Sequence, residues 1–222
     1  MKRQQLKTKG FILGSKTIGE KDRYVFIYTK DLGKFKAVAL GAMNPSSKFT
    51  GLLETITMCN FDMYQGPKST IITEVKPEKI YKKIRTDFKK ISSAILIAKI
   101  INDLTLEHEN IPKLFDLIDE SLTEIEKQND ESKILLISLS FVLKFLDLTG
   151  LLPDFKHHSF EQNEYHSKNI DHKYIKLLSF LREKPVSATG QIKLKENEEI
   201  LIRDIIKDIV ENETSRELKL PI

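Results

Sequence analysis

The sequence predicts an α+β protein, with a five-stranded β-barrel at the N-terminus and an all-α helical domain after it. Two observations lead to this prediction. Apolar residues alternate in short runs up to Val75, whereas beyond Pro77 they recur at helical spacing. The charged residues are also distributed unevenly. The first 90 residues contain 19 Lys and Arg and 8 Asp and Glu, whereas the remaining 132 contain 17 Lys and Arg and 24 Asp and Glu. We therefore expect two domains, residues 1–78 and 79–222.

Five strand-like runs make up the predicted barrel, and they cover residues 10–16, 24–29, 34–40, 52–61 and 69–75. Turn-forming residues separate the runs, among them Gly19, Gly33, Gly41, Pro45 and Gly66. In the third run, alternation places Phe35, Ala37 and Ala39 on one face and both Lys34 and Lys36 on the other. Five strands in about 70 residues fit a small closed barrel.

Helical periodicity predicts three long helices after the barrel: one from Ile91 to Leu104, one that opens at Ile111-Pro112, and one from Ser132 to Leu148. The third is apolar on nearly every side, so we expect it at the centre of the helical domain. Helices resume at residues 174–181 and 202–210. A polar, cysteine-free insertion near residues 153–172, which shows no periodicity, separates them from the third helix.

Composition excludes several classes of protein. The only cysteine, Cys59, lies in an apolar strand run, which excludes a disulfide framework and predicts a buried thiol. No run of 18 apolar residues is present, so we expect no membrane span and a cytoplasmic location. A nuclease is an alternative, but the acids near turns lack paired spacing, and P-loop, HExxH and GxSxG motifs are absent. We therefore predict a protein that is not an enzyme.

Several motifs occur in a fixed order along the chain. In the predicted barrel they are Gly10-Phe11-Ile12-Leu13, Gly19-Glu20-Lys21-Asp22, Leu32-Gly33-Lys34, Leu40-Gly41-Ala42 and Ser46-Ser47-Lys48-Phe49. Further along they are Arg85-Thr86-Asp87-Phe88, Leu148-Thr149-Gly150-Leu151-Leu152-Pro153 and Ser215-Arg216-Glu217-Leu218. Together they resemble the bacterial RecO family of DNA repair proteins, whose N-terminal domain is an OB-fold.

The resemblance implies a recombination mediator that performs no covalent chemistry and needs no cofactor. Such a protein binds single- and double-stranded DNA, anneals complementary strands, engages the C-terminal tail of the single-strand binding protein, and with RecR helps to load RecA. Its expected location is the nucleoid. An alternative is an RNA- or ribosome-associated OB-fold protein, because the same basic barrel suits either nucleic acid.

One departure from the family concerns zinc. Many RecO proteins carry a four-cysteine zinc module after the segment that here ends at Pro153, and this chain has no cysteine there. The remaining candidate ligands are His157, His158, His166 and His172. Their spacing matches no standard ligand frame, so we predict that no metal is bound.

We expect DNA affinity to come from basic side chains that neutralise phosphates and release counterions. The predicted nucleic-acid-binding residues are Lys9, Arg23, Lys34, Lys36, Lys48, Phe49, Lys68, Lys82, Lys83 and Arg85, with Lys89 and Lys90 extending the patch. Phe49 either packs or stacks on a base, and packing is the favoured reading. The acidic tail of the single-strand binding protein should meet basic anchors on the helical domain, for which the candidates are Lys144, Lys173, Lys176, Arg182 and Arg203.

Overall fold

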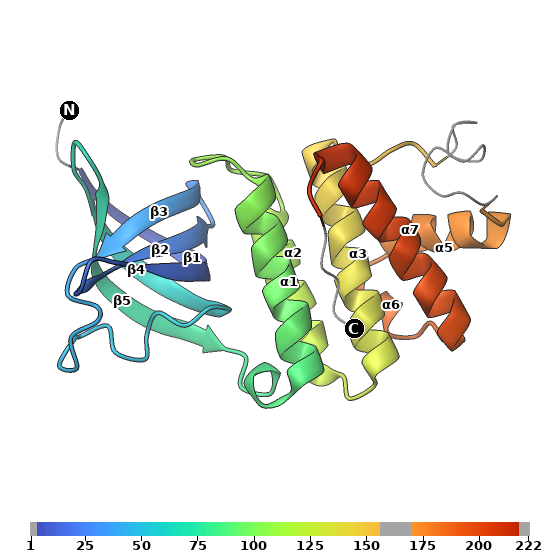
Figure 1. Ribbon diagram of the computed structural model, residues 1–222, viewed down its shortest axis with the longest axis horizontal. Helices are drawn as coiled ribbons and strands as arrows, with labels where there is room; N and C mark the ends of the chain where they lie inside the picture. The colour runs from blue at the N-terminus through green and yellow to red at the C-terminus, as the bar shows by residue number, and fades with distance from the viewer. Residues whose placement is uncertain (1–3, 156–169, 218–222) are drawn as a thin grey trace. The chain divides into compact units, whose positions relative to one another are not determined.

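The computed structural model describes residues 4–155 and 170–217 (Figure 1). Five strands form a closed barrel in the order β1-β2-β3-β5-β4. They are β1 (Gln4–Ile18), β2 (Asp22–Thr29), β3 (Gly33–Ala39), β4 (Thr57–Gln65) and β5 (Thr70–Ile80). Every pair is antiparallel except β3 with β5, which is parallel. The predicted fold class, a five-stranded N-terminal sheet followed by helices, is confirmed.

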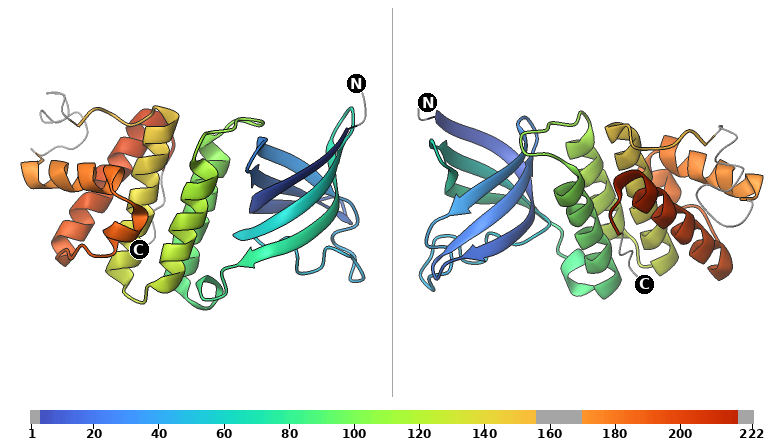
Figure 2. Two further views of the ribbon diagram at one scale, coloured as in Figure 1. Left: turned by 180° about the vertical axis from the view of Figure 1, so that it is seen from behind. Right: turned by 45° about the horizontal axis from the view of Figure 1, so that its top comes forward.

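The barrel is filled by the side chains that alternate inward along each strand. Val25 and Ile27 of β2 and Ala37 and Ala39 of β3 are fully buried in one cluster with Cys59, as the alternation predicts. Figure 2 shows the strands curving around this interior from two further directions. The prediction of a buried Cys59 is confirmed.

The fourth strand begins later than predicted, at Thr57 and not at Leu52. Residues 40–56, between β3 and β4, form a series of turns, in which Gly41 and Gly51 have φ angles of 66° and 72°. The apolar residues of this segment are therefore not strand residues. Phe49 and Leu53 instead reach the barrel interior from the loop, where each is 4% exposed.

The helical region begins with a short 3₁₀ turn, η1 (Ile84–Thr86). Its helices among the described residues are α1 (Phe88–Leu104), α2 (Leu114–Lys127), α3 (Glu131–Thr149), α5 (His172–Glu183), α6 (Val186–Thr189) and α7 (Glu196–Thr214). One start differs from the prediction. Pro112 precedes α2 and does not open it, because Lys113 takes a left-handed conformation with φ 67°.

Helix α3 is the central helix of this region, as predicted, and it packs against α5, α6 and α7. Residues from Ile134 to Leu146 are buried around nearly its whole circumference. Both of its ends are capped: the Asp130 carboxylate accepts hydrogen bonds from the Ser132 and Lys133 amides, and Gly150 takes a left-handed conformation. None of the helices in the described ranges is long and apolar enough to cross a bilayer.

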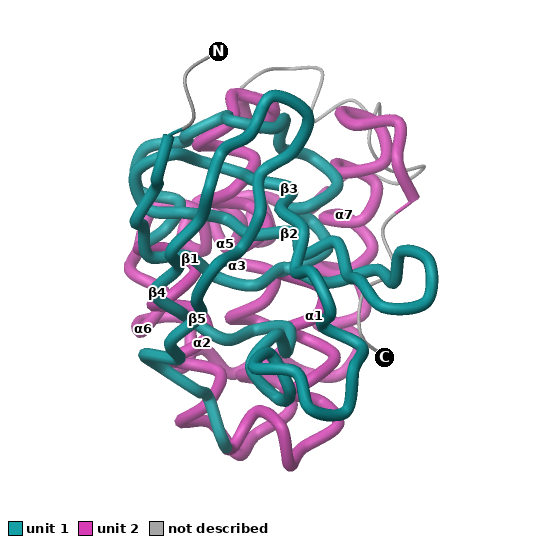
Figure 3. The backbone as a smooth tube through the Cα atoms, turned by 90° about the vertical axis from the view of Figure 1, so that its left-hand side faces the viewer, with its two compact units in different colours: residues 1–82, 98–115 teal, residues 83–97, 116–222 magenta. Residues whose placement is uncertain are grey.

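The chain divides into two compact units, coloured separately in Figure 3. Unit 1 contains residues 1–82 and 98–115, and unit 2 contains residues 83–97 and 116–222. The C-terminal half of α1 and the segment after it thus belong with the barrel. The boundary after residue 78 stays a prediction about folding domains.

Candidate nucleic-acid interface

Part of the outer surface of the barrel is covered by residues 98–115 of unit 1. The Phe115 ring lies 4.8 Å from the ring of Phe11 on β1. The Tyr28 hydroxyl of β2 accepts a hydrogen bond from the Ile111 amide at 2.9 Å, and burial raises the Tyr28 pKa. This part of the surface is therefore closed to ligands.

Lys34 lies in the covered part, which corrects its predicted place in an exposed basic patch. Its side chain is buried, and its ammonium donates to the carbonyl oxygens of Asn102 and, at 2.8 Å, Thr105. These carbonyls lie at the C-terminal end of α1, where main-chain acceptors lack helical partners and the helix dipole is negative. Alternation does place Lys34 on the outside of the sheet, but the α1 terminus covers that position.

One uncovered part of the outer surface is formed by β1, β2 and β3, and we call it the β2–β3 face. It consists of Lys16, Tyr24, Phe26, Lys36 and Val38. Cross-strand partners point to the same side of a sheet, and Lys16 pairs with Tyr24, Tyr24 with Val38, and Phe26 with Lys36. Both aromatic side chains are half-buried, so part of each ring is open to solvent.

A cation–π contact orders this face. The Lys36 Nζ lies 4.2 Å from the centroid of the Tyr24 ring, which fits the diagonal position of the two residues on β3 and β2. Two loops adjoin the face: residues 19–21 between β1 and β2, and residues 66–69 between β4 and β5. Each loop carries an exposed lysine, Lys21 and Lys68 respectively.

The β2–β3 face and the other side of the barrel differ in whether their lysines are paired with carboxylates. On β1, β4 and β5, Lys7 pairs with Asp62 at 3.1 Å, Lys76 with Glu74 at 2.9 Å, and the predicted DNA-binding Lys9 with Glu78. In contrast, Lys16, Lys21, Lys36 and Lys68 form no ion pair with any residue that the structure describes. Four lysines without an ion pair among the described residues thus lie on or beside the β2–β3 face.

Three other predicted residues lie around the loop between β3 and β4. Phe49 is only 4% exposed, so it packs in the core and is not a stacking surface. Lys48 donates to the Thr73 carbonyl at 2.7 Å and lies 5.2 Å from the Phe49 ring centroid. The Arg23 Nε lies 3.0 Å from the sulfur of Met43, which belongs to this loop. Lys48 and Arg23 thus keep their charge near the surface while holding this loop.

Comparison with known proteins assigns the family. Residues 1–81 match the family model described as Recombination protein O N terminal, and residues 85–221 match Recombination protein O C terminal. The chain belongs to the RecO family. The DNA repair protein RecO of Caldanaerobacter subterraneus subsp. tengcongensis is 32% identical over 148 residues, and that of Alkaliphilus metalliredigens is 28% identical over 148 residues. Each match covers 67% of this chain and 59% of the relative, so the chain spans under two thirds of these RecO proteins.

The remaining predicted DNA-binding residues of this RecO-family chain follow β5. Lys82 is exposed and belongs to unit 1, whereas the exposed Lys83 and Arg85 belong to unit 2. Lys90, expected to extend the patch, is instead buried, and its ammonium donates to the Glu126 carbonyl at 3.3 Å. Lys89 lies 3.6 Å from Glu131.

The predicted binding residues do not include four residues on or beside the β2–β3 face: Lys16, Lys21, Tyr24 and Phe26. A signal for the aromatic residues is present in β2, where aromatic residues at 24, 26 and 28 alternate with Val25 and Ile27. That pattern directs all three rings outward. The cover over Tyr28 could not be read from it, because residues 98–115 are distant in sequence.

Most predicted partner anchors of the helical region have acceptors within unit 2. Lys144 donates to the Arg182 carbonyl at 2.6 Å, and burial lowers its pKa. Lys173 pairs with Glu198 at 2.9 Å, a contact that raises the Lys173 pKa, and Arg182 pairs with Asp147 at 2.9 Å. Arg203 lies 3.9 Å from Asp204, while Lys176 is exposed.

The structure describes little of the candidate metal site. His157, His158 and His166 lie outside the described residues, and His172 is exposed at the start of α5. Within residues 4–155 and 170–217, His, Cys, Asp and Glu side chains form no group of three or more able to hold a metal ion. The only thiol is buried in the barrel, so this chain does not fit a four-cysteine zinc module.

Proposed function

We propose that this chain acts in DNA repair as a RecO-type recombination mediator, and that its barrel binds single-stranded DNA on the β2–β3 face. One observation carries the proposal. Open aromatic rings on this face are flanked by four lysines that have no ion-pair partner among the described residues. OB-folds use the surface of their second and third strands, with the two adjoining loops, to bind oligonucleotides.

The two kinds of side chain have different roles in this binding. Lysines neutralise phosphates and release counterions without regard to sequence. The Tyr24 ring offers a surface on which an unpaired base can stack. The cation–π contact with Lys36 holds this ring in place. Because stacking requires an exposed base, the face favours single strands over duplexes. Phosphate contacts alone would give weaker binding to double-stranded DNA.

The other expected activities follow from the family and remain part of the proposal. A surface that screens phosphates and leaves base edges free can bring complementary strands together for annealing. The helical region would contact the tail of the single-strand binding protein, and RecR would join the complex that loads RecA. No covalent step is required of the protein.

The first prediction tests the stacking role of Tyr24. Replacing it with alanine should weaken binding of a single-stranded oligonucleotide roughly five- to 150-fold, since one base–aromatic stack contributes about 1–3 kcal/mol. Fluorescence anisotropy with a labelled oligothymidine would measure the change. Tyr174→Ala is the matched control, because Tyr174 also lies under a lysine, with Lys173 Nζ 4.6 Å from its ring centroid.

Equal effects of the two tyrosine substitutions would show that the β2–β3 face is not the binding surface. Competition by an RNA oligomer of the same sequence separates the DNA proposal from the RNA alternative. Preferential displacement by RNA, with no annealing of complementary DNA strands, would favour the latter.

A further inference from the structure

A pocket in unit 1 lies between the start of β2 and the loop that joins β3 to β4, and we call it the loop pocket. Its volume is about 240 Å³. Arg23 of β2 lines it together with residues between positions 42 and 54 of the loop, among them Met43, Pro45 and Glu54. The pocket has room for a ligand of the size of one nucleobase.

The loop pocket adjoins one end of the β2–β3 face. Arg23 immediately precedes Tyr24 in β2, and it pairs with Ala39 of β3, the neighbour of Val38 on the face. Alternation directs Arg23 to the opposite side of the strand from Tyr24, the side on which Val25 is fully buried in the barrel. A nucleotide next to one that is stacked on Tyr24 can therefore direct its base into the pocket.

The guanidinium of Arg23 is held in position but is not neutralised. Its Nε lies 3.0 Å from the Met43 sulfur. Its Nη groups form no hydrogen bond and no ion pair with any residue in the described ranges. A guanidinium presents its donors in a rigid fork, so Arg23 can bind two adjacent acceptor atoms of a ligand.

An unpaired carboxylate lines the same pocket. Glu54 is exposed, and within the part of the chain that the structure describes it pairs with no cation, Arg23 included. A phosphate would be attracted by Arg23 but repelled by Glu54. A neutral ligand with acceptors on one edge and donors on another can instead satisfy both groups.

Met43 gives the pocket an apolar contact. Its side chain is 39% exposed although it is a large apolar residue. Thioether sulfur makes favourable contacts with aromatic rings, and covering Met43 would remove apolar surface from water. The chemistry of the loop pocket therefore favours a flat aromatic ligand that carries both donors and acceptors.

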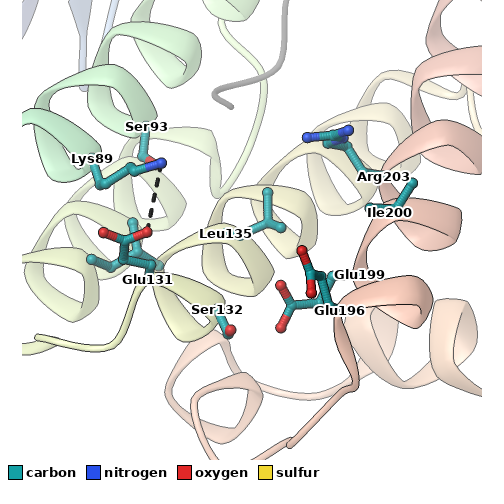
Figure 4. A pocket seen from close by; sticks show the side chains of 10 residues that line it. Lys89, Ser93, Glu131, Ser132, Leu135, Glu196, Glu199, Ile200 and Arg203 are labelled. Atoms are coloured by element: carbon teal, nitrogen blue, oxygen red, sulfur yellow. Dashed lines mark ion pairs between the residues drawn. The ribbon is translucent and has the colours of Figure 1, made fainter.

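The pocket of unit 2 in Figure 4 does not share this combination. Its Lys89 is paired with Glu131 at 3.6 Å, and its Arg203 lies 3.9 Å from Asp204. Both cations thus have a carboxylate beside them, whereas Arg23 has none among the described residues. We therefore assign a ligand to the loop pocket alone.

We propose that the loop pocket binds one guanine base of single-stranded DNA, an inference that rests on the proposed DNA binding by the β2–β3 face. Guanine is the nucleobase with two adjacent acceptors, O6 and N7, beside two adjacent donors, N1–H and the N2 amino group. The Arg23 fork donates to O6 and N7, which is the commonest specific contact between arginine and a base. The Glu54 carboxylate accepts from N1–H and N2, and Met43 covers the ring.

Oligonucleotides that differ at one base test the proposal on the full chain. One is a short oligothymidine, and the other has a single guanine at its centre. The guanine oligonucleotide should bind roughly fivefold or more tightly, as expected for one well-placed base contact. Hypoxanthine, which lacks the N2 amino group, and 7-deazaguanine, which lacks N7, should each reduce this preference roughly twofold or more.

Variants assign each edge of the base to one side chain. Glu54→Ala should bind the guanine and hypoxanthine oligonucleotides equally, and Arg23→Gln should bind the guanine and 7-deazaguanine oligonucleotides equally. The matched controls are Glu196→Ala and Arg216→Gln, which remove the same charges at exposed sites outside the loop pocket and should keep both preferences. Melting temperatures establish that each variant is folded.

Methyl NMR of methionine-labelled protein gives a direct readout of occupancy. The ring current of a bound guanine should shift the Met43 methyl signal. Met58 and Met63 are buried in the barrel, 4% and 0% exposed, so their signals should stay in place. Oligothymidine should leave the Met43 signal much less affected than the guanine oligonucleotide.

The possible failures can be told apart. Equal binding of the oligothymidine and guanine oligonucleotides to the unaltered protein would overturn the guanine assignment and leave the DNA proposal intact. An Arg23→Gln variant that weakened both oligonucleotides by the same factor would assign Arg23 to a phosphate, and it would overturn the inference too. Binding of neither oligonucleotide would overturn the proposed function and this inference with it.

Discussion

Three lysines share a structural role at the scale of single residues. Lys34, Lys90 and Lys144 each donate a hydrogen bond to a main-chain carbonyl in the last turn of a helix, at Asn102 of α1, Glu126 of α2 and Arg182 of α5. Helix ends leave carbonyls without partners and carry partial negative charge. A lysine in such a place stabilises the fold and is lost as a phosphate ligand, which a count of charges along the sequence does not reveal.

The second prediction concerns Lys34 alone. Replacing it with glutamine should lower the free energy of unfolding by about 2–3 kcal/mol, because charge-assisted hydrogen bonds to buried carbonyls are lost. Urea denaturation measures this loss. DNA affinity of the folded variant should be unchanged, because the ammonium is not available to phosphate. A stable variant with weakened DNA binding would contradict the assignment.

The third prediction follows from the burial of Cys59, which raises the pKa of its thiol from 9.0 to about 12. Above pH 9 the thiol ionises in the unfolded chain but not in the folded one, so stability falls as pH rises through this range. The stability advantage of the wild-type protein over Cys59→Ala should shrink by about 1 kcal/mol between pH 9 and pH 10. Urea titrations at both pH values give this difference, and a constant value would show that the thiol is not protected.

At the scale of elements, turn glycines show how far local sequence determines geometry. Gly19 and Gly33 both have positive φ, 56° and 72°, and both were predicted as turn residues. Their surroundings differ. A Cβ at Gly33 would lie 2.2 Å from the Glu109 carbonyl oxygen, whereas a Cβ at Gly19 or Gly14 would meet no atom within 4 Å. The close approach at Gly33 comes from a segment far along the chain.

The fourth prediction uses these three glycines as a series. Gly14→Ala should be close to neutral, Gly19→Ala should cost about 1–2 kcal/mol through backbone strain, and Gly33→Ala should cost more because strain and collision add. Thermal or urea unfolding orders the variants. If Gly33→Ala proved no worse than Gly19→Ala, the packing of residues 105–110 on β3 would be refuted.

The elements of the barrel were predictable from sequence because alternation and turn chemistry are local. Cys59 and the inward alanines of β3 illustrate this success. Alternation gave a wrong strand start where apolar residues lie outside a strand. Leu52 and Leu53 resemble the start of a strand, but they belong to a loop that packs against the barrel core. The cover over Tyr28 and Lys34 depends on contacts between distant segments, and periodicity contains no information about them.

At the scale of the whole molecule, the arrangement of charge matters more than its total. The net charge is only +4, and many lysines are paired with carboxylates or bonded to helix ends. What distinguishes the β2–β3 face is that its lysines lack such partners. The sequence indicated a basic N-terminal part, but pairing depends on which strands become neighbours.

The fifth prediction compares two lysines that contribute equally to net charge. Lys36 lies on the β2–β3 face, and Lys76 lies on the opposite set of strands, 2.9 Å from Glu74. Lys36→Gln should weaken binding of single-stranded DNA roughly threefold or more and reduce the slope of log K against log salt by about 0.7, the value for one lost phosphate contact. Lys76→Gln should change neither quantity, because that ammonium is already compensated. Oligonucleotide titrations between low and moderate salt give both slopes. If the two variants behaved alike, the net charge of the protein and not the position of each lysine would govern binding. That result would contradict the assignment of the β2–β3 face as the DNA-binding surface.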